Sequence, residues 1–196
     1  MHATPTRPIR DEAELRGLLS QVLDLVPDTR YRLVGTGAAM LHGVRLPVGD
    51  IDLLYAARAD IDRFAAALGT FPCQREPIWL PAAHQYYAAY AVGDISVSAS
   101  TLEAATREHA IERRRTAPWQ HYRLIGCRHH RIPAVALELQ LVADVLRERP
   151  DRYRPVIEHL RRHGHNRALL ERSLRDWRLP ESRHRWVLDR LDGAAP

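Results

Sequence analysis

Two aspartates separated by one residue are the part of this sequence best suited to do chemistry. Asp50 and Asp52 lie between apolar residues in the segment VGDIDLLY, whose composition is typical of a β-strand. Side chains two residues apart on a strand point to the same face, so the two carboxylates would lie together. Like charges at that spacing repel unless a cation neutralises them. Because hard divalent cations prefer oxygen ligands, the pattern predicts a Mg²⁺ site, with Mn²⁺ as an alternative.

A glycine-rich turn comes before this strand in the sequence. Residues 31–34 have the pattern of a short strand, and Gly35, Thr36 and Gly37 follow at the start of a short apolar helix. Such a turn presents free backbone N–H groups that can bind a phosphate. Thr36 has two compatible roles, to bind phosphate through its hydroxyl or to cap the helix. Carboxylates that bind a metal near a phosphate site are the components of a phosphoryl-transfer site.

Two simpler interpretations of these motifs are less favoured. A Rossmann dinucleotide site does not fit, because no third glycine follows at the required position. A surface strand with two solvated aspartates remains an alternative. However, charges on a strand bordered by apolar residues are costly without partners, which favours a metal site.

This order of motifs resembles the nucleotidyltransferase superfamily related to DNA polymerase β. Its signature joins a hydrophobic residue, a Gly and a Gly or Ser to a later Asp-x-Asp between hydrophobic residues. Val34, Gly35 and Thr36 match the first half, with Thr in the last position, and residues 50–54 match the second. Within the superfamily, the segment TGAAMLHGVR is most similar to the AbiEii and MenT toxin-type nucleotidyltransferases, and Arg45 matches an Arg that often precedes their DxD.

The resemblance implies both a fold and a reaction. The fold would be α+β, with a nucleotidyltransferase-like mixed sheet flanked by helices and a C-terminal helical region after it. The reaction would be the Mg²⁺-dependent transfer of an NMP from an NTP, with release of pyrophosphate. Asp50 and Asp52 would bind the metal, and Gly35, Thr36 and Arg45 would bind the nucleotide.

Members of the superfamily usually carry a third acid on a later strand. Asp94 is the only acid between residues 85 and 100, so we expect it to be the third catalytic and metal-binding carboxylate. The alternative is that Gly93 and Asp94 simply form the turn of a hairpin. In that case Ser96 or Ser98 would occupy the usual position of the third acid.

The acceptor implied by the resemblance is RNA, such as a tRNA, and an antitoxin protein is the implied partner of a toxin. The net charge of +5, carried entirely by Arg with no Lys, supports RNA because Arg binds phosphates bidentately and stacks on bases. Residues 107–131 combine Arg with Trp119 and Tyr122, which suits single-stranded RNA but equally describes a solvated Arg-rich face. Other hypotheses are nucleotidyl transfer to a small molecule or protein, and a non-catalytic nucleotide- or RNA-binding module.

The composition changes near Pro133. We therefore predict a nucleotidyltransferase core over residues 1–131 and a helical region over residues 132–196. The sequence has no apolar stretch long enough for a transmembrane helix and no signal peptide at residues 1–10. We expect a cytoplasmic protein that does not associate with membranes and whose two cysteines are free thiols.

Several other residues could contribute to a site. The similar toxins often have a Lys and an acid in their helical region, but this chain has no Lys. Glu138 lies in an apolar helix, where an ion pair with an Arg is favoured over a place in the active site. His42 is assigned a packing role. Two groups could suggest zinc but lack a second ligand pair at the usual spacing, so zinc is not predicted: Cys127, His129 and His130, and His159, His163 and His165.

Overall fold

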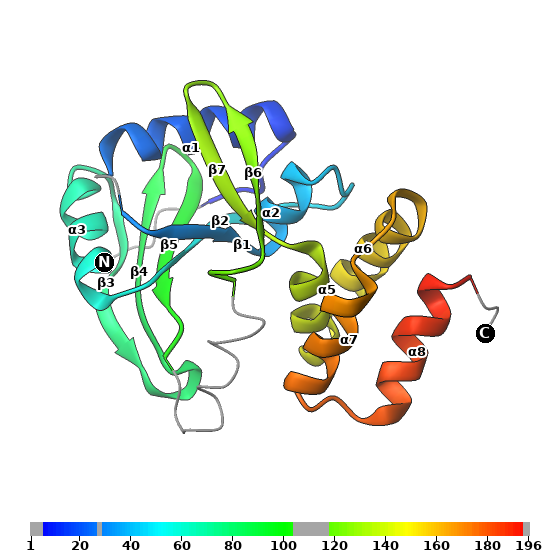
Figure 1. Ribbon diagram of the computed structural model, residues 1–196. Helices are drawn as coiled ribbons and strands as arrows, with labels where there is room; N and C mark the ends of the chain where they lie inside the picture. Colours follow the sequence, from blue (N-terminus) through cyan, green and yellow to red (C-terminus); the bar gives the residue numbers. More distant parts are fainter. Residues whose placement is uncertain (1–5, 27–28, 104–117, 194–196) are drawn as a thin grey trace.

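A seven-stranded mixed sheet, the helices α1, α2 and α3 packed against it and a group of four C-terminal helices make up the described part of the protein (Figure 1). A computed structural model describes residues 6–26, 29–103 and 118–193. The strand order in the sheet is β3-β4-β5-β2-β1-β7-β6. This α+β architecture confirms the predicted fold class.

The helices and strands follow the sequence motifs closely. In chain order they are α1 (Glu12–Leu25), β1 (Tyr31–Val34), α2 (Gly35–Leu41), β2 (Asp50–Tyr55), α3 (Arg58–Ala67), β3 (Cys73–Leu80), β4 (Gln85–Val92), β5 (Ile95–Thr101), β6 (Tyr122–Cys127), β7 (His130–Val135), α5 (Leu137–Leu146), α6 (Pro150–His163), α7 (Arg167–Asp176) and α8 (Glu181–Leu191). A short 3-10 helix, Pro81–Ala83, joins β3 to β4.

The strand β2 lies in the middle of the sheet. It pairs antiparallel with β1, with Val34 opposite Asp52, and parallel with β5, with Ser98 opposite Asp52. The strand β4 then pairs antiparallel with β5, so the expected hairpin around Gly93 is present. Because β2 is paired at both edges, its polar residues are held at a fixed register. Its residues Ile51, Leu53 and Tyr55 are buried in the core that the sheet shares with α1–α3.

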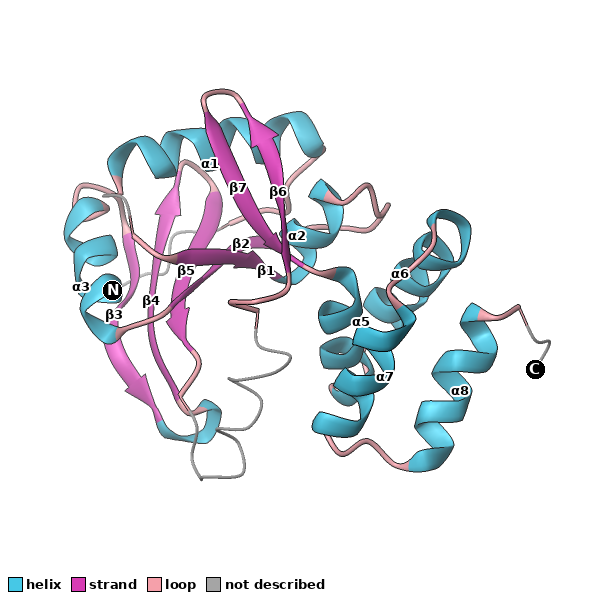
Figure 2. Cartoon of the chain, in the orientation of Figure 1, coloured by secondary structure: helices cyan, strands magenta, loops and turns pink. Residues whose placement is uncertain are grey.

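Two apolar cores stabilise the molecule. The first lies between the sheet and helices α1–α3, and includes Leu15, Leu19 and Val22 of α1. The second joins α5–α8 to Ala39 of α2 and to residues of the loop after it. Figure 2 shows the C-terminal helices grouped beside the sheet. None of the helices in the described residues has the length and apolar character needed to cross a membrane.

The helical region begins later than the sequence suggested. The predicted boundary between residues 131 and 132 falls inside β7, and the first helix after it starts at Leu137. Residues 132–135 of β7 are all buried, and a short continuous apolar run of this kind fits a strand buried on both faces. Pro133 does not end the strand, because a strand tolerates a proline where the missing N–H is not needed for the hydrogen bonds between strands.

Candidate functional site

The two aspartates lie at the start of β2, next to the point where β1 passes into α2. Asp50 pairs with Ser96 and Asp52 with Ser98 on the neighbouring strand β5. On the other side, Asp52 lies opposite Val34, the last residue of β1. The register therefore brings the carboxylates, the β5 hydroxyls and the Gly35 turn to one place, as the motif spacing predicted for Asp50 and Asp52.

Gly35 is required at this junction for two reasons. Its φ is +68°, a left-handed conformation that favours glycine. A Cβ atom added here would lie 2.7 Å from Oδ2 of Asp52, closer than non-bonded atoms approach. The glycine thus allows the backbone to turn and the Asp52 carboxylate to lie directly against it.

Asp52 is held in an environment that resists its negative charge. Burial raises the pKa of Asp52 to about 6, and the neighbouring Asp50 charge adds to the increase. The hydroxyl of Ser98 donates a hydrogen bond to Oδ1 at 2.7 Å and, with Arg152 and Arg147, partly offsets this rise in pKa. A cation bound beside the two carboxylates would favour their ionised forms. These oxygen donors are of the kind that Mg²⁺ and Mn²⁺ prefer, so the residues fit such a metal.

A cavity of about 240 Å³ opens beside Asp52. Its polar lining comes from both halves of the chain, with Gly35, Asp52 and Ser98 from the sheet and Gln140, Arg147 and Arg152 from the helical region. Tyr87 and Trp177 add aromatic surface. Two arginines therefore supply positive charge in a chain that has no Lys, and the cavity combines metal-type ligands with groups that bind phosphate.

The sequence alone did not identify Gln140 as a site residue. Its Oε1 accepts a hydrogen bond from the backbone N–H of Gly35 at 3.0 Å, and its Nε2 donates to Oδ2 of Asp144 at 2.8 Å. Asp144 is fully buried, and burial raises its pKa. The N–H expected to bind phosphate is thus already paired, so a phosphate must exchange with the Gln140 amide at that atom.

Two solved structures resemble this one in fold. A candidate nucleotidyltransferase from Thermotoga maritima matches over 79% of this chain and 97% of its own, with a TM-score of 0.56 and 14% sequence identity. An antigenic nucleotidyltransferase-like protein from Paracoccidioides brasiliensis matches over 94% of each chain, with a TM-score of 0.50 and 14% identity. The chain has a nucleotidyltransferase-like fold. No family model and no curated protein matches the sequence.

Asp94 is not brought to the other two carboxylates. It lies in the β4–β5 turn with 56% of its side chain exposed, and Nε of Arg7 donates to its Oδ2 at 2.6 Å. It is not among the described residues that line the cavity. The predicted third metal ligand therefore finds no support in this placement. The alternatives Ser96 and Ser98 occupy the β5 positions beside Asp50 and Asp52.

Thr36 and Arg45, the other predicted nucleotide ligands, lie outside the cavity lining in the described residues. Thr36 is buried, and α2 has no side-chain capping hydrogen bond, so the predicted capping role of Thr36 is wrong. Arg45 is exposed in the loop between α2 and β2. Direct contact with a nucleotide at Thr36 or Arg45 remains a prediction from the resemblance.

Other side chains singled out from the sequence have local partners. Glu138 is 9% exposed, and its Oε1 accepts a hydrogen bond from the Asn166 backbone N–H at 2.7 Å, which fastens the start of α7. This bond differs from the ion pair that we expected. His42 forms a 2.8 Å hydrogen bond with the Val135 carbonyl, in keeping with a packing role. Four of the basic residues of segment 107–131 lie outside the described residues: Arg107, Arg113, Arg114 and Arg115.

A Gly35→Ala substitution should displace the Asp52 carboxylate, whereas a Gly93→Ala substitution should not. Both glycines have positive φ, but only Gly35 has an atom of Asp52 within reach of an added Cβ. Each variant should lose about 1–2 kcal/mol of unfolding free energy from the left-handed backbone. Only Gly35→Ala should also change the ¹³C chemical shift of the Asp52 carboxyl carbon. An unchanged Asp52 resonance in Gly35→Ala would contradict this close contact.

An Asp52→Asn substitution should remove a pH-dependent loss of stability. The folded-state pKa of about 6 lies above the ordinary value of 3.8, so the folded protein retains a proton between about pH 4 and 6 that the unfolded chain releases. Wild-type stability should therefore fall as pH rises through this window. At pH 7 and with EDTA present, Asp52→Asn should be more stable by about 1–3 kcal/mol.

Chemical denaturation from pH 4 to 8 measures this effect. Asp94→Asn is the matched control, because Asp94 is exposed and should leave the fall in stability intact. If the unfolding free energy of wild type and of Asp52→Asn changes with pH in parallel, the pKa of Asp52 is not raised in the folded protein as described.

Proposed function

We propose that this protein is a divalent-metal-dependent nucleotidyltransferase that moves an NMP from an NTP to an acceptor hydroxyl. The observation that carries the proposal is the pair Asp50 and Asp52 at the β1–α2 junction of a nucleotidyltransferase-like fold. A cavity with Arg147 and Arg152 opens beside Asp52, and Asp50 lies two residues before Asp52 on β2, outside the described lining. Carboxylates facing phosphate-binding cations suit a substrate that joins a metal ion to a triphosphate.

Each side chain has a role that follows from its position. Asp50 and Asp52 would hold Mg²⁺ or Mn²⁺, and Ser98 orients Asp52 through its hydrogen bond. A bound metal would supply charge neutralisation at the phosphates and activation of the acceptor hydroxyl. Arg147 and Arg152 bind phosphate oxygens of the NTP. The acceptor oxygen bonds to the α-phosphorus, the bond to the bridging oxygen breaks, pyrophosphate leaves, and the hydroxyl proton passes to solvent.

A basic and aromatic groove supports RNA, such as a tRNA, as the acceptor. A space of about 530 Å³ lies along α6 and α8, lined by Arg154, Arg161, Arg183 and Arg190 together with Tyr153 and Trp186. The Tyr153 and Trp186 rings pack edge to face with centroids 5.4 Å apart. Positive charge next to aromatic rings is suited to single-stranded nucleic acid. A toxin role and an antitoxin partner rest only on the similarity of residues 36–45 to the toxin group.

A nucleotide-binding module without catalysis is the second candidate. The observation in its favour is that β5 carries Ser96 and Ser98 beside the aspartates rather than a third acid. The Gly35 N–H is also already bonded to Gln140. Binding and catalysis are therefore to be measured separately.

Incubation with each α-³²P-labelled NTP, total tRNA and Mg²⁺ or Mn²⁺ tests the reaction. We expect label to move to RNA with wild type and to fall about 100-fold or more with Asp50→Ala, Asp52→Ala, because the metal ligands are lost. Asp94→Ala is the matched acidic control and should retain activity within about threefold.

The location of the label separates the hypotheses. Label on protein or on a small molecule instead of RNA would replace the RNA acceptor with the corresponding alternative. NTP binding without transfer under any metal condition would leave the binding module as the function.

Substitution of the cavity arginines should weaken NTP binding without the need for turnover. Arg152→Ala or Arg147→Ala should raise the Kd for NTP with Mg²⁺ about tenfold, because a charge-assisted hydrogen bond contributes about 1.5–3 kcal/mol. Arg154→Ala, two residues further along in the α6–α8 groove, should leave the NTP affinity unchanged and weaken binding of tRNA. Calorimetry measures the NTP affinity, and an electrophoretic mobility shift measures tRNA binding. If Arg147→Ala and Arg152→Ala bind NTP as tightly as Arg154→Ala and wild type do, this cavity is excluded as the triphosphate site.

A further inference from the structure

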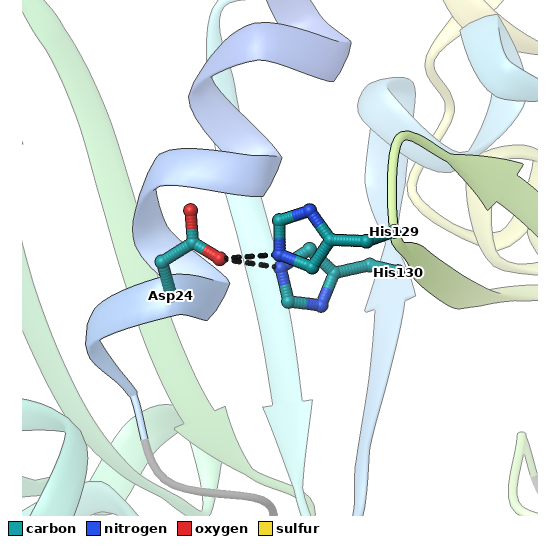
Figure 3. Close-up of side chains that lie close together, drawn as sticks. All are labelled: Asp24, His129 and His130. Carbon is teal, nitrogen blue, oxygen red and sulfur yellow. Dashed lines mark hydrogen bonds and ion pairs between the residues drawn. The ribbon is translucent and has the colours of Figure 1, made fainter.

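Two histidines and an aspartate converge at a place that shares no residue with the Asp52 cavity. His129 and His130 lie at the turn between β6 and β7, and Asp24 lies near the C-terminal end of α1 (Figure 3). The Nε2 atoms of His129 and His130 lie 2.7 Å and 2.8 Å from the same oxygen, Oδ1 of Asp24. The sequence pattern points to the two histidines but not to Asp24, because Asp24 is more than one hundred residues away from them in the chain.

The hairpin turn makes this arrangement possible. Neighbouring residues on a regular strand point to opposite faces, but Arg128 at the turn has a φ of +52° and breaks the alternation. The two imidazole rings consequently lie side by side, with centroids 4.1 Å apart. Both rings present the same nitrogen to α1, which is the arrangement required of two ligands to one ion.

The hairpin is also fastened to α1 beside these histidines. The Cys127 thiol donates to the Arg16 carbonyl at 3.1 Å, and the Arg16 guanidinium donates to the Gly126 carbonyl. Cys127 is buried, is bonded to Arg16 and is not part of the three-residue group of possible ligands, so the sequence-based group of Cys127, His129 and His130 is not a ligand set. These contacts fix the backbone that positions the two imidazoles, so their geometry does not depend on the Asp24 interaction alone.

We propose that Asp24, His129 and His130 form a binding site for a transition-metal ion, with Zn²⁺ as the occupant. Imidazole nitrogen and carboxylate oxygen are ordinary zinc ligands at about 2.0–2.2 Å. The three ligating atoms all lie within 4.8 Å of one another, and ligands of a tetrahedral zinc ion stand about 3.3–3.6 Å apart by the same bond lengths. A small side-chain movement therefore accommodates the ion.

Zinc would replace the shared hydrogen bonds with coordinate bonds. Each Nε2 would bind the ion through its lone pair, so a neutral imidazole would carry its proton on Nδ1 and an imidazolium would release one proton to solvent. One negative charge from Asp24 offsets part of the ion's charge. The fourth position is open, because a space of about 300 Å³ lined by His129 and His130 adjoins the cluster. Water fills that position. The ion would tie α1 to the turn between β6 and β7, and β6 is at the edge of the sheet.

Another histidine pair provides the competing location. The rings of His159 and His163 stack with centroids 4.2 Å apart on α6, and a pair at this helical spacing also binds metals. No Asp or Glu joins that pair in a three-ligand group among the described residues. The experiment therefore has to distinguish the two pairs directly.

Metal titration of the full chain without an affinity tag tests the proposal. The titration uses the Asp50→Ala, Asp52→Ala variant as background, so that no Zn²⁺ bound at the proposed nucleotidyltransferase site is measured. The result is then independent of the proposed nucleotidyltransferase function. We expect one tight equivalent of Zn²⁺ in a chelator competition and a Co²⁺ visible spectrum of low coordination number. The His129→Ala, His130→Ala variant should bind at least about tenfold more weakly, and Asp24→Asn should also weaken binding.

Thermal unfolding gives a second readout. Zn²⁺ should raise the Tm of the background protein and should not raise that of the His129→Ala, His130→Ala variant. His159→Ala, His163→Ala is the matched control and should retain both the affinity and the Tm increase. If the first variant fails to fold by circular dichroism, Asp24→Asn decides the question. The proposal is overturned if Zn²⁺ does not bind, or if binding is lost in the His159 and His163 variant instead.

Discussion

The crowding of negative charge at the start of β2 is the constraint around which the candidate site is built. Asp50 and Asp52 share one face of a central strand, and burial together with mutual repulsion raises the pKa of Asp52 to about 6. A strand selected only for stability would carry apolar residues here. The neighbouring structure instead accommodates Asp52 with a glycine where a side chain would collide and with the Ser98 hydroxyl on β5. These local choices favour ionisable oxygen ligands over stability.

The helical region belongs to the same site. Helix α5 is buried on most of its surface, and its Gln140 reaches the backbone of Gly35 across the junction between the two regions. The apolar core of α5–α8 also includes Ala39 of α2. A shared core and a direct hydrogen bond hold the two parts together, so Arg147 and Arg152 have defined positions beside Asp52. The change of composition near residue 131 and the start of the helices at Leu137 therefore both lie within one packed unit.

Local patterns predicted the strand–turn–helix–strand unit, the aspartate pair and the β4–β5 hairpin, because each depends on residues close in sequence. Gln140, Arg147 and Arg152 could not be found in this way. Their role depends on strand pairing and helix docking over long separations, and two arginines do not stand out in a chain whose basic residues are all Arg. Asp94 shows the reverse error. It was chosen as the only acid between residues 85 and 100, but the structure places it in the β4–β5 turn with Arg7.

The Gln140 amide defines what a ligand has to do at the Gly35 turn. Its oxygen accepts the Gly35 N–H, while its NH₂ group donates to the buried Asp144. A hydrogen bond between neutral amides is weaker than one to a charged phosphate, so a phosphate positioned by Arg147 and Arg152 would compete favourably for that N–H. Gln140 retains Asp144 as a partner after the exchange. The Gly35 N–H is thus satisfied by Gln140 without ligand, and a bound phosphate would take over that donor.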